Sequence, residues 1–371
     1  MVANVVKLGE LCEILDSKRK PITKRDRVVG EYPYYGATGI QDYVADYIFD
    51  EKLVLVGEDG AKWGTGENTA YAISGKSWVN NHAHVLRPNR NKILDNYLIY
   101  YLNQIDLSPY ITGAIIEKLN QEQLKNIAIP LPTIQEQTRI VSLMNKADEI
   151  RQKKKLANDK LDEFLKSTFI DMFGDPVKNE KELPLVKFSD MGTLARGKSK
   201  YRPRNAPELL GGVYPLIQTG DVANAGLYLR KYTQTYSELG LKQSKMWKSG
   251  TLCITIAANI AKTAIMTFDA CFPDSVVGFI NNDKCNIQYI QFWLMFLQAV
   301  LEAEAPQSAQ KNINLEILNG LSLPYPPLEQ QNKFAQIVEK VEAQKQRNEQ
   351  VIEQMNNLFN SLSQEIFNKN I

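Results

Sequence analysis

The sequence has 371 residues, of which 44% are hydrophobic and 23% are charged, and its formal net charge is +2. It is long enough for two or three domains, and its composition is that of a folded protein rather than a disordered one. The first ten residues lack the pattern of a signal peptide, and the most apolar run, residues 292–301, is too short to span a bilayer, so we expect a cytoplasmic protein.

Residues 1–132 are expected to form a first globule that mixes short strands with a helix over residues 96–104. Its early part contains a basic stretch, residues 17–30, with six Lys or Arg against one Asp. A buried strand is predicted over residues 52–56. The glycine-rich segment that follows, with Lys62 and Trp63, is typical of a tight loop.

A long helix is predicted over residues 133–174. Thr133 and Glu136 match a capping box at its start, and Gly174 is a typical helix stop. Apolar residues recur every three or four positions and predict one long buried seam. The seam is expected to comprise Ile140, Leu143, Ala147, Ile150, Lys154, Ala157, Leu161 and Phe164. A helix of about 40 residues rises roughly 60 Å, so this seam requires a second long helix.

The rest of the chain repeats the first part. A linker over residues 175–185 leads to a second globule, residues 186–326, and to a second long helix, residues 327–371. The two helical stretches align without a gap, with corresponding residues 194 positions apart. The second seam is expected to comprise Phe334, Ile337, Val341, Gln344, Asn348, Val351, Met355 and Leu358. Both seams become polar at mid-length, at Lys154 and Asn348, whether the helices run parallel or antiparallel.

The predicted fold is therefore of the α+β class. It has two similar mixed α/β domains joined by two long helices that form a coiled coil, with a pseudo-two-fold internal repeat. The duplicated globules agree best in the approach to the helix and least in their loops. This is expected if one frame presents two different surfaces.

The sequence offers weak signals for catalysis. Residues 192–199, GTLARGKS, match a phosphate-loop pattern, but Pro203 and Pro207 follow where that motif needs a helix. His82 and His84 are the only histidines, too few for a histidine-rich metal site and a weak basis for a catalytic triad. The four cysteines have no regular spacing, which argues against a zinc cluster or a disulfide framework. We predict no metal site and no catalytic residues.

The basic loops are the remaining functional signal. Residues 186–262 carry twelve Lys or Arg against four Asp or Glu, and such concentrations suit a polyanion. Lys and Arg neutralise phosphates, while Arg, Gln and Thr can read base edges. The candidate DNA-binding residues are Lys18, Arg19, Lys24, Arg25, Tyr35, Thr38, Lys62 and Trp63 in the first globule, and Lys198, Lys200, Tyr201, Arg202, Arg204, Gln218, Thr219 and Lys262 in the second.

The junction between globule and helix carries a resemblance to a known family. Residues 129–140 read IPLPTIQEQTRI and residues 323–334 read LPYPPLEQQNKF. With this repeated junction, the sequence closely resembles the specificity subunit of type I restriction-modification enzymes over its whole length. The resemblance implies two target-recognition domains that each read one half of a bipartite DNA site. It also implies antiparallel helices that set the separation of the two domains.

The same resemblance implies partners in a prokaryotic cytoplasm. Two modification subunits, which carry S-adenosylmethionine and methylate adenine, would dock on the helices and domains, and restriction subunits would join with ATP and magnesium. No cofactor is expected in this chain. The residues expected to form the seam and to support docking are Ile140, Leu143, Ile150, Leu161, Phe164, Phe334, Ile337, Val341, Val351 and Leu358. The competing hypotheses are a non-catalytic coiled-coil scaffold and a phosphate-loop enzyme.

Overall fold

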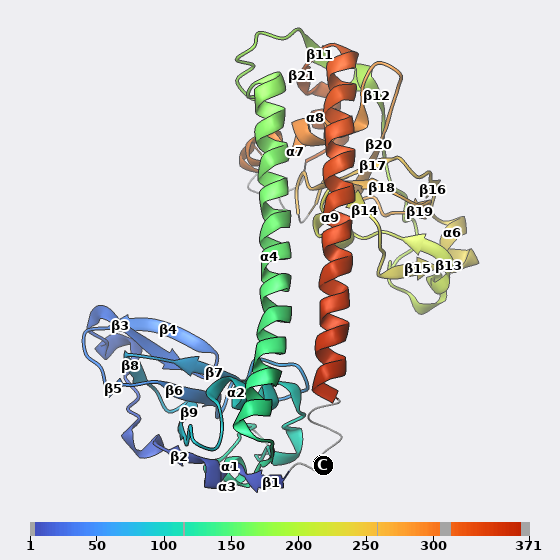
Figure 1. Cartoon of the computed structure of the whole chain (residues 1–371). Helices are drawn as coiled ribbons and strands as arrows, with labels where there is room; N and C mark the ends of the chain where they lie inside the picture. The colour runs from blue at the N-terminus through green and yellow to red at the C-terminus, as the bar shows by residue number, and fades with distance from the viewer. Residues whose placement is uncertain (1–3, 114–115, 258, 305–312, 365–371) are drawn as a thin grey trace. The chain divides into compact units, whose positions relative to one another are not determined.

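The computed structural model describes residues 4–113, 116–257, 259–304 and 313–364 (Figure 1). The chain divides into two compact units, Met1–Leu156 with Asn348–Ile371, and Ala157–Arg347. The boundary falls inside the two long helices, α4 (Ile134–Phe173) and α9 (Leu328–Ser363). Each unit therefore contains one globule and one half of each long helix. Among the described residues, no helix is both long and apolar enough to cross a membrane.

The globule of the first unit contains two four-stranded sheets. One has the order β2 (Cys12–Ile14), β9 (Ala83–Pro88), β6 (Leu53–Gly57) and β7 (Ala70–Ile73), with all pairs antiparallel. The other has the order β4 (Gly39–Val44), β3 (Val29–Gly36), β8 (Lys76–Val79) and β5 (Phe49–Asp50), with β3 and β8 parallel. Strand β6 reads LVLVG and is fully buried, as its unbroken apolar run predicts.

The remaining elements of this unit attach the globule to α4. Strand β1 (Asn4–Lys7) pairs with β10 (Ala128–Leu131), and the short helices are α1 (Leu8–Leu11), α2 (Asp95–Gln104) and α3 (Gln121–Asn126). Single turns of 3-10 helix lie at Asp16–Lys18, Lys24–Asp26 and Ser108–Tyr110. A core beneath α2 includes Ile140 and Met144 of α4 and Phe359 of α9.

The globule of the second unit repeats this plan. Its first sheet has the order β12 (Gly192–Arg196), β20 (Val276–Asn281), β17 (Leu252–Thr255), β18 (Thr263–Met266) and β14 (Tyr228–Leu229). Its second sheet has the order β15 (Gln234–Tyr236), β13 (Leu210–Leu216), β19 (Ala270–Cys271) and β16 (Met246–Trp247), with β13 and β19 parallel. Apart from β14, both sheets match those of the first unit strand for strand. The duplication seen in the sequence is thus a duplication of topology.

The other elements of the second unit follow the same pattern. Strand β11 (Leu185–Lys187) pairs with β21 (Ser322–Pro324), as β1 pairs with β10. The helices are α5 (Thr219–Ala223), α6 (Glu238–Lys242), α7 (Ile287–Glu304) and α8 (Leu315–Gly320), with 3-10 turns at Phe188–Met191 and Pro207–Leu209. Phe169 of α4 is fully buried and stacks on Tyr289 and Phe292 of α7.

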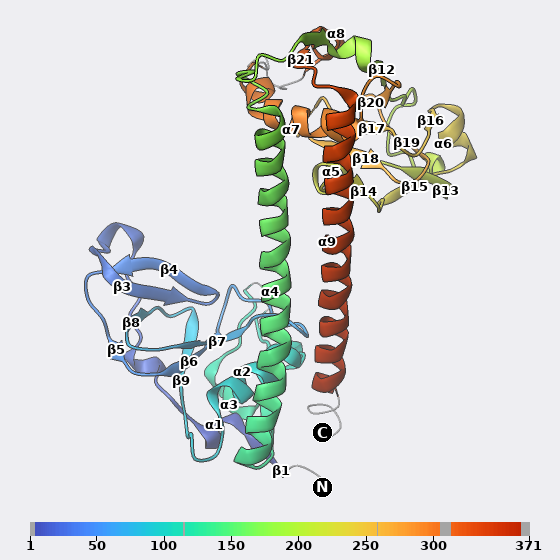
Figure 2. The same cartoon turned by 45° about the horizontal axis from the view of Figure 1, so that its top comes forward.

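Within each unit the halves of the long helices run antiparallel, as the resemblance implied (Figures 1 and 2). In the first unit, Arg151 contacts Asn356 and Lys154 contacts Asn348. Residues later in α4 therefore contact residues earlier in α9, as antiparallel helices require. In the second unit, Asp162 pairs with Lys345 and Phe173 packs on Phe334. The polar centre of the seams at Lys154 and Asn348 is therefore a real contact, 3.1 Å long.

Twelve of the sixteen predicted seam residues are buried or half-buried, five in α4 and seven in α9. At two positions of α4 the buried residue is the next one along the chain, because Met144 and Leu165 are buried where Leu143 and Phe164 were expected. The predicted seam residues that are exposed instead are Leu143 (39%), Ile150 (39%), Phe164 (49%) and Leu358 (46%). In each pair, Leu143 with Met144 and Phe164 with Leu165, both side chains are apolar and both lie three or four residues from other seam positions. Only packing against the second helix decides which of the two is buried.

The helix ends agree with their signals in part. Thr133 Oγ1 accepts a hydrogen bond from the N–H of Glu136 (3.3 Å), while the Glu136 carboxylate pairs with Arg139 instead of completing the predicted capping box. Gly174 follows α4 with a φ of +77°, a conformation that favours glycine, and donates its N–H to Ile170. The last seven residues of the predicted second helix, 365–371, lie outside the described residues.

A buried glutamine joins each long helix to its globule. In the first unit, Gln137 is 0% exposed, accepts from the N–H of Leu94 and donates to the carbonyls of Lys92 and Pro132, all at 2.9 Å. In the second unit, Gln331 is also 0% exposed and binds Asn286 N–H and the Pro326 carbonyl at 2.9 Å. The repeated Gln in the junction motif is therefore a structural joint.

Candidate nucleic-acid interface

The basic stretch of the first unit lies between β2 and β3, and Arg19 fixes its beginning. The Arg19 guanidinium is 13% exposed and donates to Glu58 (2.7 Å) and to the Ala83 carbonyl (2.8 Å). Its Nε also donates to the carbonyl of Asp16 (3.2 Å). The charge of Arg19 is thus already paired inside the globule, and its position does not support the predicted contact with DNA.

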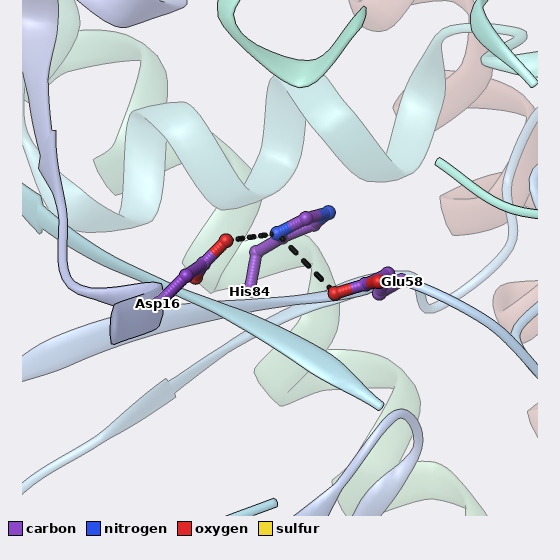
Figure 3. Close-up of side chains that lie close together, drawn as sticks. All are labelled: Asp16, Glu58 and His84. Carbon is purple, nitrogen blue, oxygen red and sulfur yellow. Dashed lines mark hydrogen bonds and ion pairs between the residues drawn. The ribbon is translucent and has the colours of Figure 1, made fainter. Parts of the chain in front are cut away.

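Arg19 pairs with both carboxylates of a cluster that Asp16, Glu58 and His84 form (Figure 3). The His84 ring is 1% exposed, with Nδ1 2.6 Å from Asp16 Oδ2 and Nε2 2.6 Å from the Leu119 carbonyl. The three side chains lie close enough for a cation, but the Arg19 guanidinium supplies the positive charge to both carboxylates. Burial alone would raise the pKa of Asp16, but the hydrogen bonds from His84 and Val85 and the positive charges nearby lower it.

The end of the basic stretch is fixed as firmly. Arg27 pairs with Asp42 (3.0 Å) and stacks over the Tyr34 ring at 4.3 Å. The hydrogen bond from Arg27 lowers the pKa of Asp42. Between these anchors, the Trp78 indole donates to the Lys20 carbonyl (2.6 Å) and the Ile22 N–H donates to the Tyr34 hydroxyl (3.0 Å). The loop is thus preorganised by its own globule.

The exposed cations of this loop are Lys18, Lys20, Lys24 and Arg25. Arg25 pairs with Asp26, but at 91% exposure this pair is weak. Lys20 is not among the candidates predicted individually, although it belongs to the same basic run. Lys18 and Lys20 are exposed on either side of the half-buried Arg19, whose guanidinium is held inside the globule by Glu58.

The other candidates of the first unit lie in different settings. Thr38 is exposed at the turn between β3 and β4, and Tyr35 is half-buried in β3 with its ring 6.0 Å from that of Tyr71. Lys62 is 80% exposed and lies 3.9 Å from Glu67. Trp63 is 8% exposed and belongs to the hydrophobic core, so the expectation that it contacts DNA is not supported by its position. A tryptophan in a glycine-rich loop gives no sequence signal of burial.

The equivalent loop of the second unit follows β12 and is also pinned to its globule. The backbone passes so close to Phe272 that a Cβ at Gly197 would lie 2.2 Å from the Phe272 carbonyl oxygen. The Gln243 side chain accepts from the N–H groups of Lys200 (2.6 Å) and Tyr201 (3.1 Å). The Ser244 hydroxyl donates to the Lys198 carbonyl (2.8 Å).

Asp274 organises the arginines of this loop. Arg202 lies 3.6 Å from its carboxylate, Arg204 forms a second ion pair with it, and Arg196 donates to its backbone carbonyl at 2.6 and 2.9 Å. Arg202 and Arg204 remain 54% and 44% exposed, so one carboxylate holds two accessible guanidinium groups. Asp274 and Gln243 were not predicted, because nothing in the sequence connects them with residues 42 to 78 positions away.

The remaining candidates of the second unit are Tyr201, Gln218, Thr219 and Lys262. Tyr201 is exposed and donates to Glu208 (3.1 Å), which raises the pKa of its hydroxyl. Gln218 caps α5 and Thr219 is the first residue of that helix. The Lys262 amine binds Gln298 (3.2 Å) and lines a cavity of about 250 Å³ with Lys166 and Lys345 of the long helices. Lys262 thus lines a cavity against the helices.

The phosphate-loop match at residues 192–199 lacks the required setting. Its first half forms strand β12, and the residues after Ser199 form bends and turns before the 3-10 turn Pro207–Leu209. A phosphate loop needs the N-terminus of a helix directly after this serine. The same segment is instead the basic loop described above.

Comparison with known proteins gives a consistent result. The sequence profile of the family described as the type I restriction modification DNA specificity domain matches residues 3–159 and 180–357. A proposed type I restriction enzyme specificity subunit of Haemophilus influenzae is 26% identical over 346 residues, which cover 90% of this chain and 86% of that protein. The type I restriction enzyme MjaVIII specificity subunit of Methanocaldococcus jannaschii is 21% identical over 372 residues, covering 91% of this chain and 85% of the relative.

Two solved structures share the fold. The S subunit of the type I restriction-modification system of M. genitalium superposes with a TM-score of 0.63 at 12% identity, covering 98% of this chain and 96% of that one. A chain from a structure of type I restriction-modification complex assembly and conformational transition gives a TM-score of 0.58 at 16% identity, with coverages of 99% and 98%.

Proposed function

Because the chain belongs to the family of type I restriction-modification specificity subunits, we propose that it selects the DNA target of such a complex without catalysing a reaction itself. Each globule would read one half of a bipartite site in double-stranded DNA. Two modification subunits would supply adenine methylation, and restriction subunits would supply cleavage. A prokaryotic cytoplasm is the compartment that this role requires.

One observation carries the proposal. The two units share their sheet order, but the preorganised basic loops that they present differ in sequence, with KRKPITKRDR at residues 18–27 and KSKYRPRNAP at residues 198–207. A repeated frame with two different cationic surfaces suits two half-sites of unrelated sequence. The predicted residues that are exposed, and that we propose for contact with DNA, are Lys18, Lys24, Arg25, Thr38, Lys62, Lys198, Lys200, Tyr201, Arg202 and Arg204.

The long helices offer surface for protein partners. In the first unit Leu143 and Ile150 of α4 are each 39% exposed, and in the second unit Phe164 is 49% exposed. Leu143 and Ile150 are seven residues apart, so they share one face of α4 in the first unit, outside the buried seam. Large apolar side chains at this spacing suit helices of a modification subunit.

Mapping of methylated adenines tests the role directly. Sequencing of the host genome with and without this gene should reveal one bipartite methylated motif that disappears in the deletion strain. Exchange of residues 199–240 with those of a homologue should change only one half of this motif. Change in both halves, or in neither, would contradict independent reading by the two domains.

A deletion in the helices tests their role as a spacer. Removal of residues 151–157 and 345–351, one heptad from each helix around Lys154 and Asn348, keeps both seams in phase. Seven residues of helix rise about 10.5 Å, the length of roughly three base pairs. The methylated motif should therefore have a spacer shorter by about three base pairs. An unchanged spacer would exclude a ruler, and undetectable DNA binding by the intact chain would favour a scaffold instead.

A further inference from the structure

The two basic loops share a pair of lysines at equivalent positions. Lys18 and Lys20 correspond to Lys198 and Lys200 at the same spacing of 180 residues that relates the beginnings of the two globules. The residues between the lysines, Arg19 and Ser199, differ in chemistry. The sequences of the two loops otherwise diverge, so this pair is a common feature of surfaces that differ elsewhere.

Both pairs have the same pattern of exposure. Lys18 and Lys20 are exposed on either side of the half-buried Arg19, and Lys198 and Lys200 are exposed on either side of Ser199, which is 5% exposed. In both loops the two lysines are thus exposed and are separated by one residue that is less exposed than they are. Each pair therefore presents two ammonium groups to solvent within three consecutive residues.

The backbones that carry these lysines are fixed, and their amines are free. In the first unit, Lys20 donates its N–H to the Val79 carbonyl (3.3 Å) and accepts from Trp78 (2.6 Å). In the second unit, the backbone N–H of Lys198 donates to the Phe272 carbonyl (3.2 Å), and the backbone N–H of Lys200 donates to the Gln243 side chain (2.6 Å). Within the described part of the chain, none of the four ammonium groups forms a hydrogen bond or an ion pair.

The neighbouring arginines are engaged in another way. Arg19 and Arg27 are anchored inside the first globule, and Arg202 and Arg204 pair with Asp274. A flexible ammonium group without an internal partner suits phosphate, whereas an oriented guanidinium suits the bidentate reading of a base. In the second unit, the exposed lysines and the exposed, paired Arg202 and Arg204 are thus prepared for different contacts.

We propose that Lys18 with Lys20, and Lys198 with Lys200, are repeat-related clamps for the phosphodiester backbone of DNA, one in each half of the target. The inference rests on the proposed function and extends it. The clamps supply affinity that is independent of base sequence, and the residues that differ between the loops supply the reading of bases. Because the clamp is shared, the bases that one globule reads can change without loss of the affinity that its lysine pair supplies.

Salt dependence measures the number of phosphate contacts. Each neutralised phosphate contributes about 0.9 to the slope of log K against log salt concentration. The double variants Lys18→Ala/Lys20→Ala and Lys198→Ala/Lys200→Ala, in the full-length chain, should each reduce this slope by about 1.8. The same relation predicts affinity losses on the order of 50-fold at 0.1 M salt. The losses should be equal for a duplex with the methylated motif and for one with scrambled sequence.

Matched variants distinguish a clamp from other roles. The double change Lys18→Arg/Lys20→Arg should keep the slope, and Lys146→Ala/Lys153→Ala, exposed on α4, should leave it unchanged. If the unchanged chain binds DNA but either alanine pair keeps the full slope, the clamp is wrong and the proposed function stands. A loss confined to one base sequence would also overturn it, because it would show base reading. If the unchanged chain shows no salt-sensitive binding to any duplex, the proposed function fails first.

Discussion

Replacement of the buried glutamine at the start of α4 should loosen the joint between helix and globule. Gln137→Leu removes three hydrogen bonds of 2.9 Å and leaves the Leu94 N–H and the carbonyls of Lys92 and Pro132 without these partners. An unpaired buried polar group costs about 1–3 kcal/mol, and the apolar leucine offsets about 1–2 kcal/mol in total. We expect a local destabilisation of about 3 kcal/mol.

The repeat supplies an internal comparison for this variant. Gln331→Leu removes two corresponding hydrogen bonds, so we expect about 2 kcal/mol in the second unit. Amide hydrogen exchange read by mass spectrometry separates the two sites. Exchange should accelerate roughly 100-fold near residues 128–140 in the first variant, and less strongly near residues 322–334 in the second.

An exposed glutamine on the same helix serves as the control. Gln152→Leu should change local stability by less than about 0.5 kcal/mol, because surface substitutions are usually neutral. If Gln137→Leu leaves exchange at the helix start as slow as this control does, the hydrogen bonds of Gln137 do not hold the joint. Acceleration in the second unit by Gln137→Leu would contradict the local character of the effect.

Three further predictions follow from single contacts. Phe169→Ala should destabilise the second unit by about 3–5 kcal/mol in urea denaturation, because this side chain is fully buried. Phe164→Ala should cost about 1 kcal/mol or less, because Phe164 is 49% exposed, and equal losses would contradict this difference in burial. Because the pKa of Asp16 is lowered, its contribution to the stability of the first unit is present above the ordinary aspartate pKa of about 3.9 and disappears as the pH falls through its folded-state pKa. The acid-induced loss of stability in this unit should therefore be smaller in Asp16→Asn, and an identical pH profile would refute this. Asp274→Asn should release Arg202 and Arg204 and raise affinity for a scrambled duplex by up to about tenfold in fluorescence anisotropy at low salt, while unchanged affinity would place these arginines away from DNA.

The candidate interface shows how far residue types alone can lead. The charge runs identified both basic loops, because their cations lie within a few residues of one another in the sequence. They could not distinguish Arg19, which is anchored by Glu58, from Lys18 and Lys20, which are exposed. That distinction depends on a carboxylate about 40 residues away, and the control of Arg202 depends on Asp274, about 70 residues away.

The sequence by itself determined the duplication, the two long helices and the positions of their polar centre, because these follow from residue spacing and local helix signals. Only the tertiary structure decided which of Leu143 and Met144, or of Phe164 and Leu165, enters the seam. Each of these pairs has neighbouring apolar side chains separated by about 100° around the helix, and the partner helix covers only one of them. It likewise decided that Trp63 belongs to the core and that the lysine pairs face solvent. Burial is set by contacts between segments distant in the chain, and local sequence carries no record of those contacts.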